Sequence, residues 1–346
     1  MLAGDKLVHS QMATIKDVAR RAGVSVGTVS NVLSGLPTVT KELRERVETT
    51  MRELRYQPSH VARSLKLKNT HTLAMVISDI TNPFFPMIVR GAEDAAAEHG
   101  YMLSIFNTDD DIERERQVCG ILSSRRVDGL LLVPALLRGD DSHIESLMQS
   151  GTPVVCMDRL PDGLDVDAVL VDNVAGVAEC IRHLVRQGAR RIAYLGGERK
   201  LYISSERLEG FKRGMRDAGI RIDPALVWEG DFRQESGFRI GKETLGKLQF
   251  DAVFVANIPM VLGFLRAMAE AGIEAPRDIL LATFDHLEIL NSFRPRLTSV
   301  AQPGYQIGQN AVKLLLDRIA TPNRASRVER LSTELKIADS SLAKFN

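Results

Sequence analysis

The stretch TIKDVARRAGVSVGTVSNVLSG, residues 14–35, decides the fold of the N-terminal part of this 346-residue chain. Its first half carries apolar side chains at helical spacing, which predicts one buried helix face. These residues are Ile15, Val18, Ala19 and Ala22. Thr14 is placed to cap this helix and Gly23 to end it, and Ser25 can cap a second helix. Two short helices joined through a glycine turn predict a helix-turn-helix, whose second helix enters the major groove of DNA.

The second helix divides its residues between two faces. The inward residues are Val29, Val32 and Leu33. The outward residues are Val26, Gly27 and Asn31, with Thr28 and Ser30 beside them. Gly35 is expected to end the helix.

A third helix is predicted next, with Thr40 as its cap and a buried apolar stripe. The stripe consists of Leu43, Val47, Met51 and Leu54. The segment YQPSHVARSLKLK, residues 56–68, then predicts a short helix after Pro58, capped by Ser59. This helix has at most about two turns, fewer than the roughly 12–15 residues that an isolated helix needs in water. We therefore expect it to order only against DNA or a second copy of the chain.

Positive charge is concentrated in this N-terminal part. Residues 13–68 hold eleven lysines and arginines and five aspartates and glutamates, a net charge of +6, whereas the whole chain carries +1. A basic helical segment can also be a solvated face, but here charge, turn and caps agree. The sequence therefore predicts a DNA-binding headpiece.

The stretch at 14–35, followed by YQPSHVARSLK, resembles the DNA-binding headpiece of the LacI/GalR family, the lactose and purine repressors. In that resemblance Val26, Gly27 and Asn31 occupy base-reading positions, and Ser25, Thr28 and Ser30 occupy phosphate-contacting positions. Thr14 and Ser59 are also expected at the DNA. Leu65 matches a leucine wedged into the minor groove, a known way to kink DNA, and Lys66 follows it in the groove. Asn31 can read adenine, whereas Val26 and Gly27 offer only apolar contact or close approach.

The composition is that of a soluble globular protein. Hydrophobic residues make up 44% of the chain, and no run approaches the roughly 18 apolar residues of a membrane span. Residues 1–12 lack the apolar core and cleavage site of a signal peptide and are expected to be a disordered leader. The three cysteines are unpaired in spacing, which favours a reducing cytoplasm and argues against a disulfide, a metal or another cofactor.

From Thr72 onward, short apolar runs alternate with helical stretches, which is typical of parallel βαβ units. Strands are expected at 73–78, 102–107, 129–134, 153–158, 191–196, 252–257 and 279–284, with a crossover near 297–302 and a final strand near 330–335. Helices are expected at 86–99, 113–125, 142–149, 206–218, 236–246, 260–271 and 306–319. The predicted fold class is α/β: a helix-turn-helix headpiece and a core of two doubly wound parallel sheets with a cleft between them.

Ligands of such sheets bind beyond the carboxyl ends of the strands. Polar and aromatic residues gather after the expected strands or in connecting segments: Asp79, Asn82, Phe84, Phe85, Asp158, Arg159, Arg207, Phe232, Asn257, Asp285 and Gln302. Their polar groups hydrogen-bond hydroxyls, and phenyl rings pack on sugar faces. Singly they are equally typical of helix caps and loops, but as a set they predict a binding cleft.

Residues 78–101 and 127–134 resemble the effector-binding core of the same family, which is similar to periplasmic sugar-binding proteins of the ribose type. The resemblance implies that all of the set above except Asp79 contact the effector. One departure concerns Ile258, which stands where the family usually has an aspartate, in the stretch ANIPMVLG. A common hexose is therefore not implied, and Arg159 and Arg207 equally suit a sugar acid or another carboxylate.

The expected divisions are a leader at 1–12, a headpiece at 13–58, a hinge helix and linker at 59–71, and a core at 72–346. The core subdomains are expected at 72–172 plus 300–325 and at 173–299 plus 326–346. The resemblance implies a cytoplasmic homodimer on a pseudo-palindromic double-stranded operator, with no membrane partner. The effector would change the subdomain angle and so the DNA affinity. Repression is the family's usual outcome, and both release and tightening of DNA by the effector fit the sequence.

Two other classes of protein compete with a regulator. An enzyme using Asp109–Asp111, Asp158 and Asp285 for glycoside chemistry is disfavoured, because the Asp run reads as a solvated helix start. The sequence shows no phosphate loop, metal-ligand cluster or nucleophile elbow, and GGERK at 196–200 lacks the third glycine of a dinucleotide fingerprint. A cytoplasmic solute-binding protein, or a regulator answering to a non-sugar ligand or a protein partner, is the remaining alternative.

Overall fold

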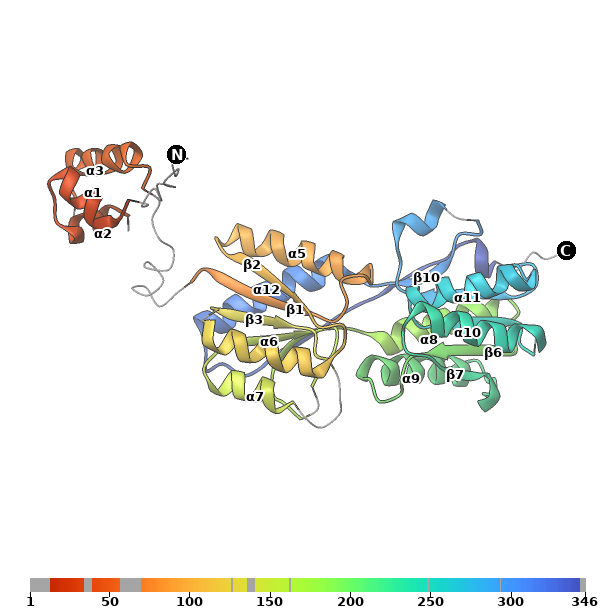
Figure 1. Cartoon of the computed structure of the whole chain (residues 1–346). Helices are drawn as coiled ribbons and strands as arrows, with labels where there is room; N and C mark the ends of the chain where they lie inside the picture. Colours follow the sequence, from red (N-terminus) through yellow and green to blue (C-terminus); the bar gives the residue numbers. More distant parts are fainter. Residues whose placement is uncertain are drawn as a thin grey trace, which may run out of the picture. The chain divides into compact units, whose positions relative to one another are not determined.

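The computed structural model describes residues 13–33, 39–56, 70–125, 127–135, 141–161, 163–247, 249–292 and 294–342. The chain divides into two compact units between Thr70 and His71. Figure 1 shows short helices in the first unit and sheets flanked by helices in the second.

The first unit contains the three predicted helices, α1 (Ile15–Ala22), α2 (Val26–Leu33) and α3 (Lys41–Glu53). Val18, Val29 and Val47, one from each helix, are fully buried in a shared core. Gly23 ends α1 in the left-handed conformation, with φ of 66°, and its N–H reaches the carbonyls of Ala19 and Arg20. The predicted helix-turn-helix is confirmed.

The helix caps were predicted with mixed success. Thr14 accepts from the N–H of Asp17 in a capping box, and Ser25 accepts from the N–H of Thr28. Thr40 stands at the N-cap of α3, but its side chain makes no cap hydrogen bond, so that part of the prediction was wrong. Gly35 and the expected hinge helix lie outside the described residues.

The second unit contains two six-stranded sheets with the same strand order. The first sheet has the order β2-β1-β3-β4-β5-β11, and all its strands are parallel. Its strands are β1 (Thr72–Ile77), β2 (Met102–Asn107), β3 (Gly129–Leu132), β4 (Val154–Met157), β5 (Asp167–Val171) and β11 (Val328–Leu331). The second has the order β7-β6-β8-β9-β10-β12, with β12 antiparallel at the edge. Its strands are β6 (Ile192–Gly196), β7 (Val227–Glu229), β8 (Ala252–Val255), β9 (Leu280–Phe284), β10 (Thr298–Ala301) and β12 (Glu334–Lys336).

Helices cover both faces of the first sheet, which with its helices is called the first subdomain. Helices α5 (Phe84–Glu98) and α12 (Gly304–Ala320) pack on one face, and α6 (Ile112–Arg125) and α7 (Ser142–Gln149) on the other. Successive residues of β1 serve opposite faces, since Met75 packs with the α5 and α12 residues and Val76 with those of α6 and α7. Burial on both faces explains why these strands read as continuous apolar runs.

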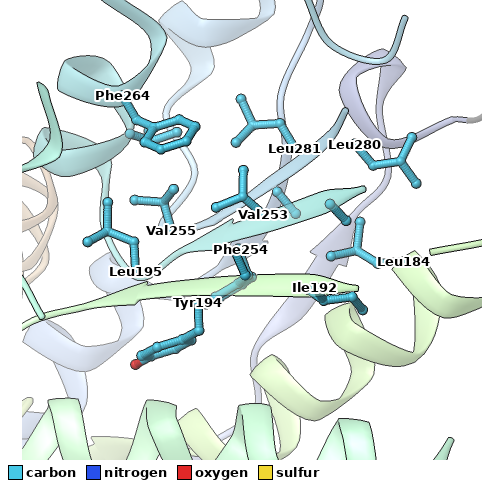
Figure 2. Packing of buried hydrophobic residues seen from close by; sticks show 14 of the residues in the cluster. Leu184, Ile192, Tyr194, Leu195, Val253, Phe254, Val255, Phe264, Leu280 and Leu281 are labelled. Atoms are coloured by element: carbon cyan, nitrogen blue, oxygen red, sulfur yellow. The ribbon is translucent and has the colours of Figure 1, made fainter. Parts of the chain in front are cut away.

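The second sheet is covered in the same way and forms the second subdomain. Helices α8 (Asn173–Arg186) and α9 (Tyr202–Asp217) pack together, as do α10 (Gln234–Thr244) and α11 (Ile258–Ala271). Figure 2 shows Tyr194 on the opposite side of the strands from Val255 and Phe264. Short 3-10 helices, η1 (Pro224–Leu226), η2 (Leu245–Lys247), η3 (Glu288–Ser292) and η4 (Asp339–Ser341), complete the described elements.

The chain passes between the subdomains three times: from β5 to α8, from β10 to α12, and from β11 to β12. The single final strand expected at 330–335 is two strands in different sheets, so the prediction was wrong there. The expected division at residue 326 also fails, because β11 pairs with β5 of the first sheet. The division expected between residues 299 and 300 was also wrong, because it falls inside β10, at 298–301, and the whole of this strand belongs to the second sheet.

Other helix and strand predictions failed at identifiable positions. Helix α5 begins at Phe84 and α9 at Tyr202, two and four residues before the expected starts. Strand β5, helix α8 and the three-residue β7 were not predicted. Strand β5 was missed because it begins with Asp167, and aspartate is more typical of loops than of buried strands.

Asp167 is buried and neutralised by arginines that are distant in sequence. Arg318 Nε lies 2.7 Å from its Oδ2, and Arg324 Nη1 lies 2.8 Å from its Oδ1. Burial opposes ionisation of Asp167, but the hydrogen bonds from Arg318, Arg324 and the Arg327 backbone outweigh it and lower its pKa.

We expect Asp167→Asn to lower the free energy of unfolding by about 3 kcal/mol, because two guanidinium groups lose their counter-charge. Because the folded-state pKa is lowered, the native side chain stabilises the protein above the ordinary aspartate pKa of about 3.9, and this contribution is lost as pH falls below it. Urea unfolding of both proteins at neutral pH and in acid measures the difference. An equal stability at neutral pH would contradict this account of the cluster.

Candidate functional site

The outer face of α2 is open to solvent. Val26 has 42% of its surface exposed, and Gly27 is also exposed, whereas Val29 on the inner face is fully buried. An exposed valine beside an exposed glycine adds nothing to the core of this unit.

Gly27 is not required by the fold. A Cβ at this position would meet only the hydroxyl oxygen of Ser25, at 3.5 Å, which is ordinary van der Waals contact. Gly23, by contrast, needs its left-handed backbone. The missing side chain of Gly27 thus leaves open space on the solvent side of α2.

The described residues include seven of the ten predicted DNA-binding positions. Thr14, Ser25, Val26, Gly27, Thr28, Ser30 and Asn31 lie in or next to α1 and α2, all at least partly accessible to solvent. The hydroxyls of Ser25 and Thr28 are 2.9 Å apart at the start of α2. Ser59, Leu65 and Lys66 lie outside the described residues.

The second unit contains a cavity of about 580 Å³ between the two subdomains. Its walls are the segments that follow β1, β2 and β4 in the first sheet and β6, β7, β8 and β9 in the second. These are the carboxyl ends of the strands, where open parallel sheets bind ligands. The cavity is thus positioned by the topology shared by the two sheets.

Arg207 of α9 is a buried charge at this cavity. Its Nη1 donates to the carbonyl of Ala256 at 2.6 Å, and its Nε donates to Oδ1 of Asn173 at 3.0 Å. Its guanidinium carbon lies 3.8 Å from the ring centre of Phe284, a cation–π distance. These contacts fix the guanidinium group from three sides.

Arg159 is also buried and already paired. Its Nη1 donates to Oδ1 of Asp110 at 2.5 Å and to the carbonyl of Pro134 at 3.2 Å. Its Nε lies 3.4 Å from Oδ2 of Asp158. The described cavity lining holds six aspartates and three arginines, so its formal charge is negative: Asp79, Asp109, Asp110, Asp158, Asp231, Asp285, Arg159, Arg207 and Arg233.

Two of these aspartates have carboxylates that are costly to keep charged. Burial raises the pKa of Asp158 despite the attraction of Arg159 and Arg207. Burial likewise raises the pKa of Asp285 despite Arg207 and a hydrogen bond from Gln302. Within the described chain, Oδ1 of Asp158 is buried and has no hydrogen-bond partner. These oxygens are therefore acceptors suited to the hydroxyls of a ligand.

Backbone strain is concentrated at the same place. The described chain has seven residues other than glycine with positive φ, and five of them line the cavity. They are Asp109, Asp110, Asp158, Phe232 and Asp285. Such conformations persist where the surrounding structure holds them, and they are common at binding sites.

Apolar side chains complete the walls. Phe84 and Phe85 stand at the first turn of α5, with ring centres 5.3 Å apart, and Phe232 lies on the second subdomain. Ile258 and Pro259 are the first residues of α11, and Ile258 is the position at which the family usually has an aspartate. Asn257 caps this helix by accepting a hydrogen bond from the N–H of Met260. Ile258 nevertheless contributes its backbone N–H to Asp285.

The structure brings nine of the ten predicted effector residues to one cavity: Asn82, Phe84, Phe85, Asp158, Arg159, Arg207, Phe232, Asn257 and Asp285. Gln302 is not part of the described lining, but its Nε2 donates a hydrogen bond to Oδ1 of Asp285. The sequence did not reveal Asn173 or the stacking of Phe284 under Arg207. Asn173 lies two residues after the end of the unrecognised strand β5, at Val171, so recognition of that strand would have indicated Asn173 as a strand-end residue.

Comparison with known proteins accords with this architecture. Residues 14–59 match the family of bacterial regulatory proteins, lacI family, and residues 181–341 match the periplasmic binding protein-like domain. The ribose operon repressor of Escherichia coli K12 is 36% identical over 312 residues, which cover 90% of this chain and 94% of that protein. This chain belongs to the lacI family. It is a DNA-binding transcriptional regulator.

Solved structures of the family are similar in fold to most of this chain. A lac repressor dimer bound to operator and the anti-inducer ONPF has a TM-score of 0.86 at 27% identity, covering 96% of this chain and all of that one. A lacI-family regulator from Enterococcus faecium with bound ribose has a TM-score of 0.71 at 29% identity, covering 80% of this chain and all of that one. Among the described residues, no helix is long and apolar enough to cross a membrane.

We expect Gly27→Ala to raise the stability of the lacI-type headpiece by roughly 0.5–1 kcal/mol, because alanine restricts the unfolded chain and meets no clash. The added methyl group should change the base preferred at the contacted position. Thermal unfolding and in vitro selection of binding sites measure the two effects. Gly23→Ala is the matched control and should destabilise the headpiece. If the selected consensus site is unchanged, the prediction that Gly27 contacts a base is wrong.

We expect Asp285→Asn to remove part of the pH dependence of stability. The folded-state pKa of Asp285 is raised, so its charge costs stability above that pKa, and the cost disappears as pH falls toward the ordinary value of about 3.9. The variant should therefore be more stable than the native protein at neutral pH, and the difference should shrink in acid. Thermal melts across this pH range test it, and a constant difference would contradict the raised pKa.

Proposed function

We propose that this regulator represses transcription as a homodimer on a pseudo-palindromic operator, and that a neutral sugar bound in the cavity controls its DNA binding. The outer face of α2 reads the bases, with Asn31 directed to adenine and Val26 and Gly27 to apolar or close contact. The hinge segment, with Leu65 and Lys66, completes the DNA surface. The role is non-enzymatic and cytoplasmic.

The charge balance of the cavity supports a neutral ligand. Arg159 is engaged by Asp110 and Asp158, and Arg207 lies in the field of Asp158 and Asp285. The carboxylate of a sugar acid would enter a lining that already has three more negative than positive groups. Hydroxyl groups, in contrast, donate to buried carboxylate oxygens and relieve their desolvation.

The single observation that carries the proposal is the unpartnered, buried Oδ1 of Asp158 beside the rings of the same cavity. The carboxylate oxygen can accept a hydrogen bond from a ligand hydroxyl. Phe84, Phe85 and Phe232 present ring faces on which a sugar ring packs. The ribose operon repressor and the ribose-bound regulator from Enterococcus faecium, both similar to this chain, make a pentose the first compound to test.

The proposal is tested by thermal shift with matched pairs of ligands, ribose against ribonate and glucose against gluconate. A neutral sugar at a hundredfold excess over its dissociation constant should stabilise the protein by about 2.7 kcal/mol, with no comparable shift from its acid. A shift by the acids alone would overturn the neutral-ligand assignment. If no sugar shifts the melting temperature but a purine or nucleoside does, the effector is a non-sugar compound and the sugar assignment is wrong.

We expect Arg207→Met to abolish the sugar-induced shift, because the ligand loses a charged donor and the aspartates lose their counter-charge. Loss of a hydrogen bond from a charged group corresponds to about 1.5–3 kcal/mol, or roughly 10–150-fold in affinity. Arg213→Met on the exposed part of α9 is the matched control and should bind normally. Operator binding without sugar, measured by fluorescence anisotropy, should remain in both variants. A normal sugar response in Arg207→Met would remove this residue from the site.

A further inference from the structure

The first two turns of α9 touch both subdomains. Tyr202, at the start of the helix, packs against the core of the first subdomain, although α9 belongs to the second. Ile203 lines the cavity, as does Arg207. Glu206 accepts a hydrogen bond from Arg330 of β11, a strand of the first sheet.

Helical spacing sorts these residues into two neighbouring faces. Tyr202 and Glu206 are four residues apart and share a face, and Ile203 and Arg207 share the next one. The first pair faces Arg330, and the second pair faces the cavity. Because a helix moves as a rigid element over two turns, displacement of one face also displaces the other.

The contact with β11 is a closed set of hydrogen bonds. Arg330 donates from Nη2 to the Tyr202 hydroxyl at 2.9 Å and from Nη1 to Oε1 of Glu206 at 3.2 Å. The Tyr202 hydroxyl donates to the same Oε1 at 2.6 Å. Burial and the hydrogen bond to Glu206 raise the pKa of Tyr202 to about 12, so the phenol remains a donor at neutral pH.

Asn173 connects this set to the cavity. Its Nδ2 donates to Oε2 of Glu206 at 2.9 Å, and its Oδ1 accepts from Nε of Arg207 at 3.0 Å. Asn173 is the first residue of α8, directly after the chain crosses from the first sheet to the second. Arg330 lies just before the crossing from β11 to β12. The polar chain therefore runs from one crossover to the other and ends at the cavity.

We propose that Arg330, Tyr202 and Glu206 form a latch that holds the two subdomains in one relative orientation, and that Asn173 and α9 tie this latch to Arg207. These are positioning residues, since they act on the cavity only through Arg207 and the subdomain angle. The same helix, α9, therefore contacts both the ligand cavity and the first subdomain. The latch goes beyond the proposed function, and its test needs no effector.

The test measures the distance between the subdomains by double electron–electron resonance on the full chain. Spin labels are attached to cysteines introduced at Glu113 of α6 and Glu235 of α10, both exposed and each on its own side of the cavity. The native cysteines at 119, 156 and 180 are buried, so they do not compete for the label.

Arg330→Met keeps an unbranched side chain that matches the aliphatic stem of the arginine, and it removes the guanidinium donors. Arg296→Met is the matched control, because Arg296 is similarly exposed, at 49% against 45%, and its partner Asp339 lies in the same subdomain. Tyr202→Phe removes only the hydroxyl and serves as a second latch variant.

The expected result is a distance distribution that broadens or shifts by at least about 2 Å in Arg330→Met, changes in the same direction in Tyr202→Phe, and is native in Arg296→Met. Native distributions in both latch variants would overturn the proposal, and so would equal broadening in Arg296→Met. Addition of ribose forms a separate arm. If it leaves the native distribution unchanged, that result counts against ribose as the effector and leaves the latch result standing.

Discussion

The buried positive charge of Arg207 is the interaction on which the second unit of this lacI-family regulator depends. Asp158 comes from the first subdomain and Asp285 from the second, and the attraction of Arg207 acts on both carboxyls. Without that charge, two aspartates whose pKa burial already raises would face each other across the cavity. Arg207, together with Arg159 at Asp158, therefore offsets part of the cost of burying these two carboxyls.

The same arrangement explains how the site can respond to a ligand. The aspartates remain under-compensated, in left-handed backbone conformations, with one oxygen lacking a partner among the described residues. Buried carboxylates without hydrogen-bond donors lower the stability of the fold. A ligand whose hydroxyls donate to them supplies the missing hydrogen bonds. Arg207 is hydrogen-bonded to Asn173 and to the carbonyl of Ala256, so the cavity is connected to the crossover between β5 and α8. A ligand with different affinity for two orientations shifts their populations.

Sequence reasoning reached the architecture and most of the cavity because both follow local rules. Helical spacing and a glycine stop predicted the headpiece, and the strand-end rule placed Asp158 and Asp285 at one site before any coordinates. Prediction from sequence failed where a residue's structure depends on partners that are distant in the chain. Asp167 is compatible with a buried strand only because Arg318 and Arg324 neutralise it from about 150 residues away. The pairing of Arg330 with Glu206 depends on how β11 joins the first sheet, which no local pattern indicates.

The headpiece and the core carry separate parts of the function. The headpiece has its own buried valine core, and its outer face on α2 includes a glycine that the fold does not need. In the proposed function, specificity comes from the surface of α2 and from the hinge segment. The same proposal assigns control to the cavity of the core, and regulation then requires coupling between the two units.

The most direct test of this account is a DNA-binding titration with and without the sugar that stabilises the core. The operator is first selected in vitro with the full chain, and its affinity is then measured by fluorescence anisotropy at fixed salt. The account predicts a pseudo-palindromic site whose affinity changes about 5–150-fold when the cavity is saturated. An operator affinity that is the same with and without saturating sugar would contradict the claim that the cavity controls DNA binding.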